Sequence, residues 1–213
     1  MQINLIYTIA LFICTILLGC ILVTVLNNKR KKLLDFSFCL FISCLIICCI
    51  GQLFLLVFAE QFNINPIYFD YFVYIGTCFL PVAFLFFGLI FAKSEFKFKK
   101  KYFLLFIIPI LSLLILWTND FHHLFYVTYN TSTELTEFGP YFYVHSIYSF
   151  ILIFTGLLYL VKYTIRNAGF FSQQSILIII GVSLPIIIIL LGILGVPMTI
   201  FQIVSFVSLF YIQ

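Results

Sequence analysis

A short basic segment separates two apolar runs in residues 79–117, FLPVAFLFFGLIFAKSEFKFKKKYFLLFIIPILSLLILW. The runs are continuous and do not alternate between polar and apolar residues, so each predicts a membrane-spanning helix and not a strand of a barrel. The connection between them carries lysines at positions 93, 97 and 99–101. Because Lys and Arg are retained on the cytoplasmic side of a membrane, the stretch predicts two helices joined by a cytoplasmic turn.

The composition of the whole chain agrees with this local pattern. Of the 213 residues, 64% are hydrophobic and only 8% are charged, and the mean hydropathy is +1.24. Soluble domains contain roughly 25% charged residues. We therefore predict an integral membrane protein, with lipid as its surroundings. The net charge of +4 follows from the sidedness of basic residues, so we expect no nucleic-acid partner.

Seven apolar stretches approach the length that crosses a bilayer. They cover residues 5–26, 34–58, 68–92, 102–117, 143–163, 175–194 and 198–213. The seventh is still apolar at the last residue and barely spans the hydrocarbon core, so we expect it to be cut short. The prediction is an all-α polytopic bundle of seven transmembrane helices that forms one membrane domain over residues 1–213, without an output domain.

The charged residues predict the orientation of this bundle. Lys and Arg occur only after the first, third and fifth stretches, as Lys29, Arg30, Lys31, Lys32, Lys93, Lys97, Lys99, Lys100, Lys101, Lys162 and Arg166. The alternate connections carry all three histidines with Glu60, Asp70, Asp120, Glu134 and Glu137. The N-terminus is therefore expected outside and the C-terminus in the cytoplasm.

Enzymatic and disulfide interpretations find little support. All seven cysteines lie inside the predicted spans, where we interpret them as small apolar packing residues. No G-x-S-x-G, H-E-x-x-H or glycine-rich phosphate loop is present, so we predict no catalytic residue and no cofactor. The span centres also lack the charged residues on which coupled transport usually relies.

Proline recurs in the middle of three predicted spans, as Pro81, Pro109 and Pro185. Each proline removes a backbone hydrogen bond to the residue four positions earlier and permits a kink. The freed carbonyls are those of Thr77, Leu105 and Gly181. The three prolines are hinge candidates, although proline in a membrane helix often only shapes packing.

Polar residues concentrate at the end of the fourth span, in WTNDFHHLFY at 117–126, and continue along one face of the fifth. At helical spacing that face holds His145, Tyr148, Ser149, Leu152, Thr155, Gly156 and Tyr159, so we expect it to look inward. Three interpretations stay open. The first is ligand or proton sensing, with Asn119, Asp120, His122, His145 and Tyr148 as candidates. The second is an interfacial anchor in which Asn119 or Asp120 caps a short helix. The third is a metal site made of His122, His123, His145 and Asp120, but their spacing matches no metal motif, so we predict none.

Residues 79–126 together with FGPYFYVHSIYSFILIFTGLLYLVKY at 138–163 resemble the seven-helix membrane input domain found at the N-terminus of bacterial sensor histidine kinases and some diguanylate cyclases. The most specific elements are Thr118, Asn119, His122, Leu124 and Phe125, followed by Gly139, Pro140, Phe142, His145 and Tyr148. Asp120 stands where the family pattern has proline, and Tyr143 where it often has tryptophan.

The resemblance implies a sensory domain in the bacterial plasma membrane that passes a change through its seventh helix to a cytoplasmic output module. It also implies a homodimer and a small ligand or proton as the signal. We hypothesise that Asn119, His122 and His145 face one another at the extracellular mouth of the bundle. The alternatives are a small-molecule transporter or channel, or a structural membrane subunit that depends on a partner.

Overall fold

The computed structural model describes residues 2–28, 32–62, 64–92, 96–129, 136–166, 176, 179 and 180. These residues form the helices α1 (Gln2–Leu26), α2 (Leu33–Gln61), α3 (Ile67–Ala92), η1 (Lys100–Phe106), α4 (Ile107–Trp117), α5 (Asn119–His122) and α6 (Pro140–Arg166). The short strands β1 (Tyr126–Thr128) and β2 (Glu137–Phe138) lie between α5 and α6. Five helical segments are long and apolar enough to cross a membrane, the fourth being η1 with α4. The all-α membrane bundle is thereby confirmed. The span predicted at 198–213 and Pro185 lie outside the described residues, and of the span predicted at 175–194 only residues 176, 179 and 180 are described.

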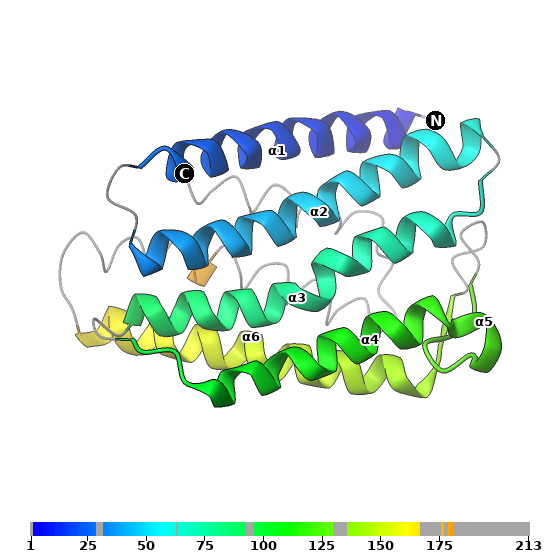
Figure 1. The fold of residues 1–213 in the computed structure, drawn as a ribbon. Coiled ribbons are helices and arrows are strands. Elements are labelled where there is room, and N and C mark those ends of the chain that lie inside the picture. Colours follow the sequence, from blue (N-terminus) through cyan, green and yellow to red (C-terminus); the bar gives the residue numbers. More distant parts are fainter. Residues whose placement is uncertain are drawn as a thin grey trace.

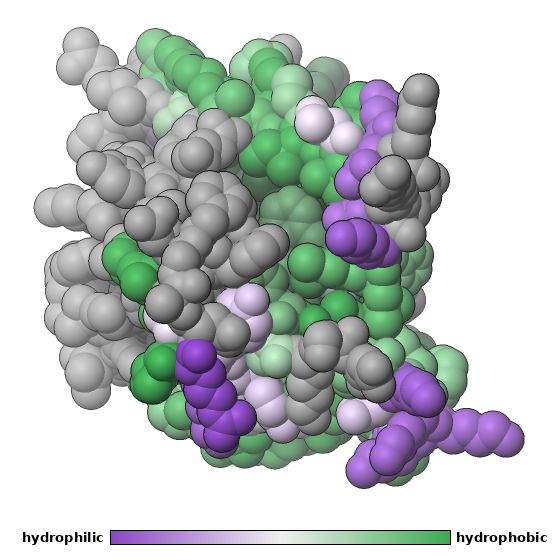
Figure 2. Space-filling view, turned by 90° about the vertical axis from the view of Figure 1, so that its left-hand side faces the viewer, coloured by the Kyte–Doolittle hydropathy of each residue, from purple (hydrophilic) through white to green (hydrophobic). Residues whose placement is uncertain are grey.

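Successive spanning helices are antiparallel and run across the view in Figure 1, so each end of the bundle holds every second connection. One end carries every described basic residue, namely Lys32, Lys97, Lys99, Lys100, Lys101, Lys162 and Arg166. Figure 2 looks onto this basic end, where hydrophilic side chains lie around the edge of an apolar surface. The opposite end carries Asp70, Asp120 and Glu137 together with α5 and the two strands. The predicted separation of charge along the helix axes is therefore present.

Helix α3 is the centre of the described bundle, because it packs against α2, α4 and α6 while α1 packs along α2. All ten of its residues from 81 to 90 are buried. Small residues permit the close packing. A Cβ on Gly76 would lie 2.5 Å from the Cys44 carbonyl oxygen of α2, and one on Gly88 would lie 2.7 Å from the Gly156 carbonyl oxygen of α6. The helix backbones touch at these glycines, as is usual for packing in membranes.

Helix α6 confirms the inward face that the sequence predicts. Its buried residues are His145, Leu152, Gly156 and Leu160, which recur at helical spacing. The opposite face exposes large apolar side chains to the surroundings: Val144, Ile147, Ile151, Phe154 and Leu158. His145 therefore faces the protein together with apolar residues of the same stripe, while an apolar face remains for lipid.

The fourth span, predicted as a helix at 102–117 with Pro109 as a hinge candidate, is divided into two kinds of helix. It consists of the 3₁₀ helix η1 followed by α4, and Pro109 lies in the first turn of α4. Proline has no N–H to donate to the carbonyl four residues earlier, but the first turn of an α-helix tolerates it. The α-helix therefore begins just before the proline, and a tighter helix leads into it.

Candidate functional site

The side chain of Asn119 holds the loop after α5 in place. It is the first residue of α5 and only 3% exposed. Its Oδ1 accepts hydrogen bonds from the backbone N–H groups of Phe125 (2.9 Å) and Tyr126 (3.1 Å), and its Nδ2 donates to the Tyr126 carbonyl (2.9 Å). The expectation that Asn119 or Asp120 caps a short helix was wrong in its detail. Thr118 occupies the N-cap position of α5 without a side-chain cap bond.

The segment before α6 docks onto this loop through its backbone. The N–H of Gly139 donates to the Phe125 carbonyl (2.8 Å), and the N–H of Tyr141 donates to the Leu124 carbonyl (3.0 Å). Beside these bonds, β1 and β2 pair antiparallel. A Cβ at position 139 would lie only 2.2 Å from the Leu124 carbonyl oxygen. Only glycine fits there, so the two sequence motifs, WTNDFHHLFY and FGPYFYVH, form one packed unit.

His145 links α6 to α4 below this unit. Ser112 Oγ donates its proton to the Ile108 carbonyl at 2.7 Å, so it accepts from His145 Nδ1 at 3.0 Å. The hydroxyl of Tyr141 also lies 3.4 Å from Ser112 Oγ. Both His145 and Ser112 are buried. The imidazole therefore carries a proton on Nδ1 and joins two spanning helices.

His122 is bonded within its own helix and turn. Thr118 Oγ1 donates to the Leu114 carbonyl (2.7 Å), so it accepts from His122 Nε2 at 3.0 Å. His122 Nδ1 accepts the backbone N–H of Leu124 at 3.1 Å. Both ring nitrogens of a neutral imidazole are thus satisfied. A second proton on this ring would displace the Leu124 N–H, since a protonated imidazole has no acceptor.

Sequence reasoning missed Asp70 as a member of the site. The hydroxyl of Tyr126 donates to Asp70 Oδ2 at 2.6 Å, which ties the loop to the first turn of α3. Burial raises the pKa of Tyr126 well above its usual range, and the nearby Tyr74 and Asp70 reinforce the shift, so the hydroxyl keeps its proton. The ring of Phe125 completes the contact, because it lies 5.0 Å from Tyr74 and 6.1 Å from His145, centre to centre. We call Asp70, Ser112, Asn119, Tyr126 and His145 the polar cluster.

Tyr148 satisfies the carbonyl that Pro109 leaves without its helical partner. Its hydroxyl donates to the backbone oxygen of Leu105, at the junction of η1 and α4. Sequence reasoning had predicted the free carbonyl and the inward side chain separately, without joining them. The Ser112–His145 and Leu105–Tyr148 bonds thus connect α4 and η1 to α6 on either side of Pro109.

The five predicted site residues meet only in part. Asn119 and His145 both contact Phe125, whereas His122 bonds Thr118 and Leu124. Asp120 is exposed in the first turn of α5. Among the residues that the structure describes, no group of His, Cys, Asp and Glu is placed to hold a metal ion. Hydrogen bonds of the cluster join the loop to α3 and α4 to α6, and the Phe125 ring brings the two sets into contact.

Comparison with known families gives this arrangement a context. A family model described as the N-terminal 7TM region of histidine kinase matches residues 10–212. The chain belongs to this family. It is therefore a multi-pass membrane region associated with signal transduction, and the resemblance expected from the two motifs is confirmed. Neither a curated protein nor a solved structure matches the chain.

The structure of this histidine kinase membrane region accommodates both departures from the family pattern. Asp120 lies in the first turn of α5, where proline is tolerated as well, and its side chain is exposed. Tyr143 is 55% exposed near the start of α6. An aromatic side chain at a helix end is suited to the headgroup layer of a membrane.

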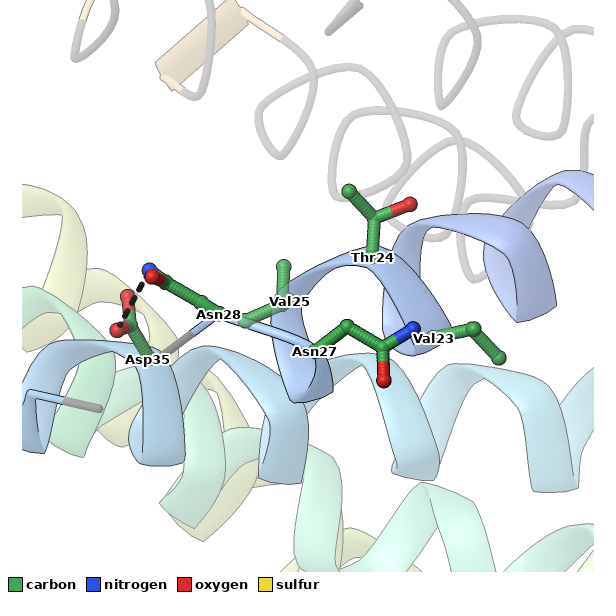
Figure 3. Close-up of a pocket in the computed structure, with 6 residues that line it drawn as sticks. All are labelled: Val23, Thr24, Val25, Asn27, Asn28 and Asp35. Carbon is green, nitrogen blue, oxygen red and sulfur yellow. Dashed lines mark hydrogen bonds between the residues drawn. The ribbon is translucent and has the colours of Figure 1, made fainter. Parts of the chain in front are cut away.

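An open recess of about 550 Å³ lies at the other end of this 7TM region, far from the polar cluster (Figure 3). It is lined by Val23, Thr24, Val25, Asn27, Asn28 and Asp35, from the end of α1 and the first turn of α2. Asn28 Nδ2 donates to Asp35 Oδ2 at 3.4 Å, and the same oxygen accepts the backbone N–H of Lys32 at 3.1 Å. These bonds start helix α2, so we interpret the recess as a capping site and not as a ligand site.

Proposed function

We propose that this chain is the sensory input domain of a sensor histidine kinase in a bacterial plasma membrane. The domain extends over residues 1–213, detects an extracellular or membrane-borne signal, and relays it through the helix predicted at 198–213. The receiver of the relay is a cytoplasmic output module in the same longer chain. In this proposal the full-length protein is a histidine kinase and works as a homodimer. The basic end of the bundle faces the cytoplasm, as the positive-inside rule predicts.

The polar cluster is the observation that carries this proposal. Buried polar groups in a membrane protein are expensive and usually functional. Here one hydrogen bond ties the loop to α3 and another joins α4 to α6, while the ring of Phe125 in the loop contacts His145 of α6. A signal that breaks one bond of the cluster therefore changes the packing of several helices together. A difference of a few kcal/mol is enough to shift a bundle between two states.

The junction at Pro109 supplies a path for the relay. The bonds Ser112–His145 and Leu105–Tyr148 hold the two sides of the junction against one face of α6. A 3₁₀ segment inside a helix often marks a hinge. When the Ser112–His145 bond is lost, the Leu105–Tyr148 bond and the longer Ser112–Tyr141 bond (3.4 Å) remain between this span and α6, so α4 is held less tightly and η1 gains freedom to shift toward the basic end.

His122 is the candidate for the receiving side of the cluster. It is half-buried, and protonation or a hydrogen-bonding ligand would compete for the nitrogen that now accepts the Leu124 N–H. Loss of that bond would loosen the turn next to Phe125, whose ring contacts His145. A proton and a hydrogen-bonding ligand would act in the same way, because each would take the place of the Leu124 N–H at His122 Nδ1.

Autophosphorylation of the full-length kinase in proteoliposomes tests the proposal. His122→Ala and His145→Ala should each change the kinase activity while the protein still inserts and purifies normally. His123→Asn is the matched control. His123 is exposed and adopts a left-handed backbone (φ 53°), which asparagine tolerates, so this variant should behave as the natural protein. Normal signalling in both alanine variants would refute the sensory role of the cluster.

A further inference from the structure

Residues 96–106 form an amphipathic segment at the basic end, which we call the basic segment. Its lysines, Lys97, Lys99, Lys100 and Lys101, are all exposed. Three large apolar side chains of the same segment are also exposed: Phe98 (53%), Phe103 (70%) and Leu104 (65%). Positive charge and apolar surface therefore occur together on the outside of one short stretch.

The 3₁₀ geometry of η1 arranges these side chains in layers. With three residues per turn, positions i and i+3 lie on the same side of the helix. Lys100 is followed by Phe103 on one line, and Lys101 by Leu104 on the next. The lysines are one turn closer to the end of the bundle than the apolar side chains. This order matches a phospholipid, whose charged headgroup lies above its acyl chains.

The inner side of the basic segment is fixed to the centre of the bundle. The ring of Phe86 in α3 lies 5.0 Å from Phe98, 5.8 Å from Tyr102 and 6.1 Å from Phe106, centre to centre. The Leu105 carbonyl accepts the hydroxyl of Tyr148 in α6. The outward side chains are therefore presented by a supported backbone and not by a loose loop.

The lysines lack negative partners in the described part of the chain, since no carboxylate there lies within ion-pair distance of any of the four. Lys101 Nζ lies 6.0 Å from the centre of the Tyr102 ring, an interaction between a cation and an aromatic face. Four neighbouring exposed positive charges attract an anionic surface. Phosphate headgroups supply that surface where acyl chains also meet Phe103 and Leu104.

We propose that the basic segment binds anionic phospholipid headgroups, and that bound lipid holds η1 against α3 and α6. The inference deepens the proposed function, because it places a lipid-dependent element at the end of the relay, and it uses the proposed orientation only to name the cytoplasmic leaflet. The lipid binding itself requires neither a signal nor a kinase. Lipid binding can therefore fail while the sensory role holds, and the sensory role can fail while lipid binding holds.

Hydrogen exchange of the full-length protein in lipid nanodiscs tests the proposal. One set of discs contains phosphatidylcholine alone, and the other contains equal parts phosphatidylglycerol and phosphatidylcholine, in both leaflets. We expect the backbone amides of residues 100–106 to exchange at least about fivefold more slowly in the anionic discs, the effect of one lysine at a membrane surface. High salt should remove the difference, because exposed charges are screened.

Two variants locate the effect. The combined substitution Lys97→Gln, Lys99→Gln, Lys100→Gln and Lys101→Gln should abolish the difference between the discs. Lys162→Gln with Arg166→Gln, which removes exposed charges at the same end on α6, should preserve it. Equal exchange of the natural protein in both discs would overturn the proposal. So would a difference that survives the fourfold substitution, or equal protection by inorganic phosphate in phosphatidylcholine discs, which would assign the site to a free anion.

Discussion

The two ends of the bundle use their polar side chains in opposite ways. At the loop end, Asn119, His122, His145 and Asp70 are all bonded to other parts of the chain. At the basic end, the lysines of residues 97–101 extend outward without carboxylate partners in the described structure. The loop end therefore responds to a signal only if an existing bond breaks, whereas the basic end can take a partner without losing any bond.

This difference explains why we assign signal detection to the loop end and lipid binding to the basic end. A bonded cluster has two well-separated states, intact and broken, and such an element can report a signal across the membrane. Exposed charges give graded attraction that depends on salt. The α4 and η1 segment joins the two ends through its contacts with α6.

Gly139→Ala should be the most damaging change at the loop end. The new methyl group would meet the Leu124 carbonyl oxygen at 2.2 Å, and backbone cannot move aside as a flexible side chain would. We expect the free energy of unfolding to fall by about 3 kcal/mol or more, measured by thermal unfolding in detergent. Gly19→Ala is the control, since a Cβ there has no atom within 4 Å. Equal stability of the two variants would show that the loop does not dock as described.

Asn119→Ala should come next, because it leaves three buried backbone groups of Phe125 and Tyr126 without their partner. A loss of about 2 to 3 kcal/mol is expected in the same unfolding assay. Asp120→Ala changes the exposed neighbouring residue and should be nearly neutral. Asn119→Asp, which retains the acceptor but not the donor to the Tyr126 carbonyl, should lie between them. If Asn119→Ala were as stable as the natural protein, the Asn119 side chain would not hold the loop in place.

Tyr126→Phe tests the connection between the loop and α3. The substitution keeps the ring and removes the hydroxyl that donates to Asp70 at 2.6 Å, so the carboxyl group loses its described donor. We expect a cost of about 2 kcal/mol, which is typical of a hydrogen bond to a charged group. Tyr143→Phe, at a position that is 55% exposed, provides the control. If both variants unfold at the same temperature, Asp70 does not belong to the cluster.

Tyr148→Phe should have the smallest effect on stability, about 1 kcal/mol for a single neutral hydrogen bond. The informative experiment is a double-mutant cycle with Pro109→Ala. Alanine restores a backbone N–H that can donate to the Leu105 carbonyl, so the hydroxyl of Tyr148 would share this acceptor with a new backbone donor. The cost of Tyr148→Phe should therefore shrink in the Pro109→Ala background. Additive costs would mean that the two residues do not share this carbonyl.

The sequence predicted the helices better than the contacts between them. Apolar length and helical spacing identified the described spans and the inward face of α6, because lipid and backbone hydrogen bonding leave few alternatives. Asp70 was missed because its partner, Tyr126, is 56 residues away along the chain. Ser112 could have been identified from the sequence, since it is the only Ser or Thr in the span at 102–117. The break at Pro109 was expected as a kink and not as a 3₁₀ helix, because the contacts of η1 with Phe86 and Tyr148 join residues far apart in the sequence.

The most direct measurement compares hydrogen exchange of the natural full-length protein and the His145→Ala variant in nanodiscs of one composition. If the two ends are coupled through α4, the variant should exchange faster at residues 119–126 and also at residues 100–106, which His145 does not touch. Faster exchange confined to the loop end would show that the cluster holds the loop alone, and would contradict a relay from the polar cluster to the basic end.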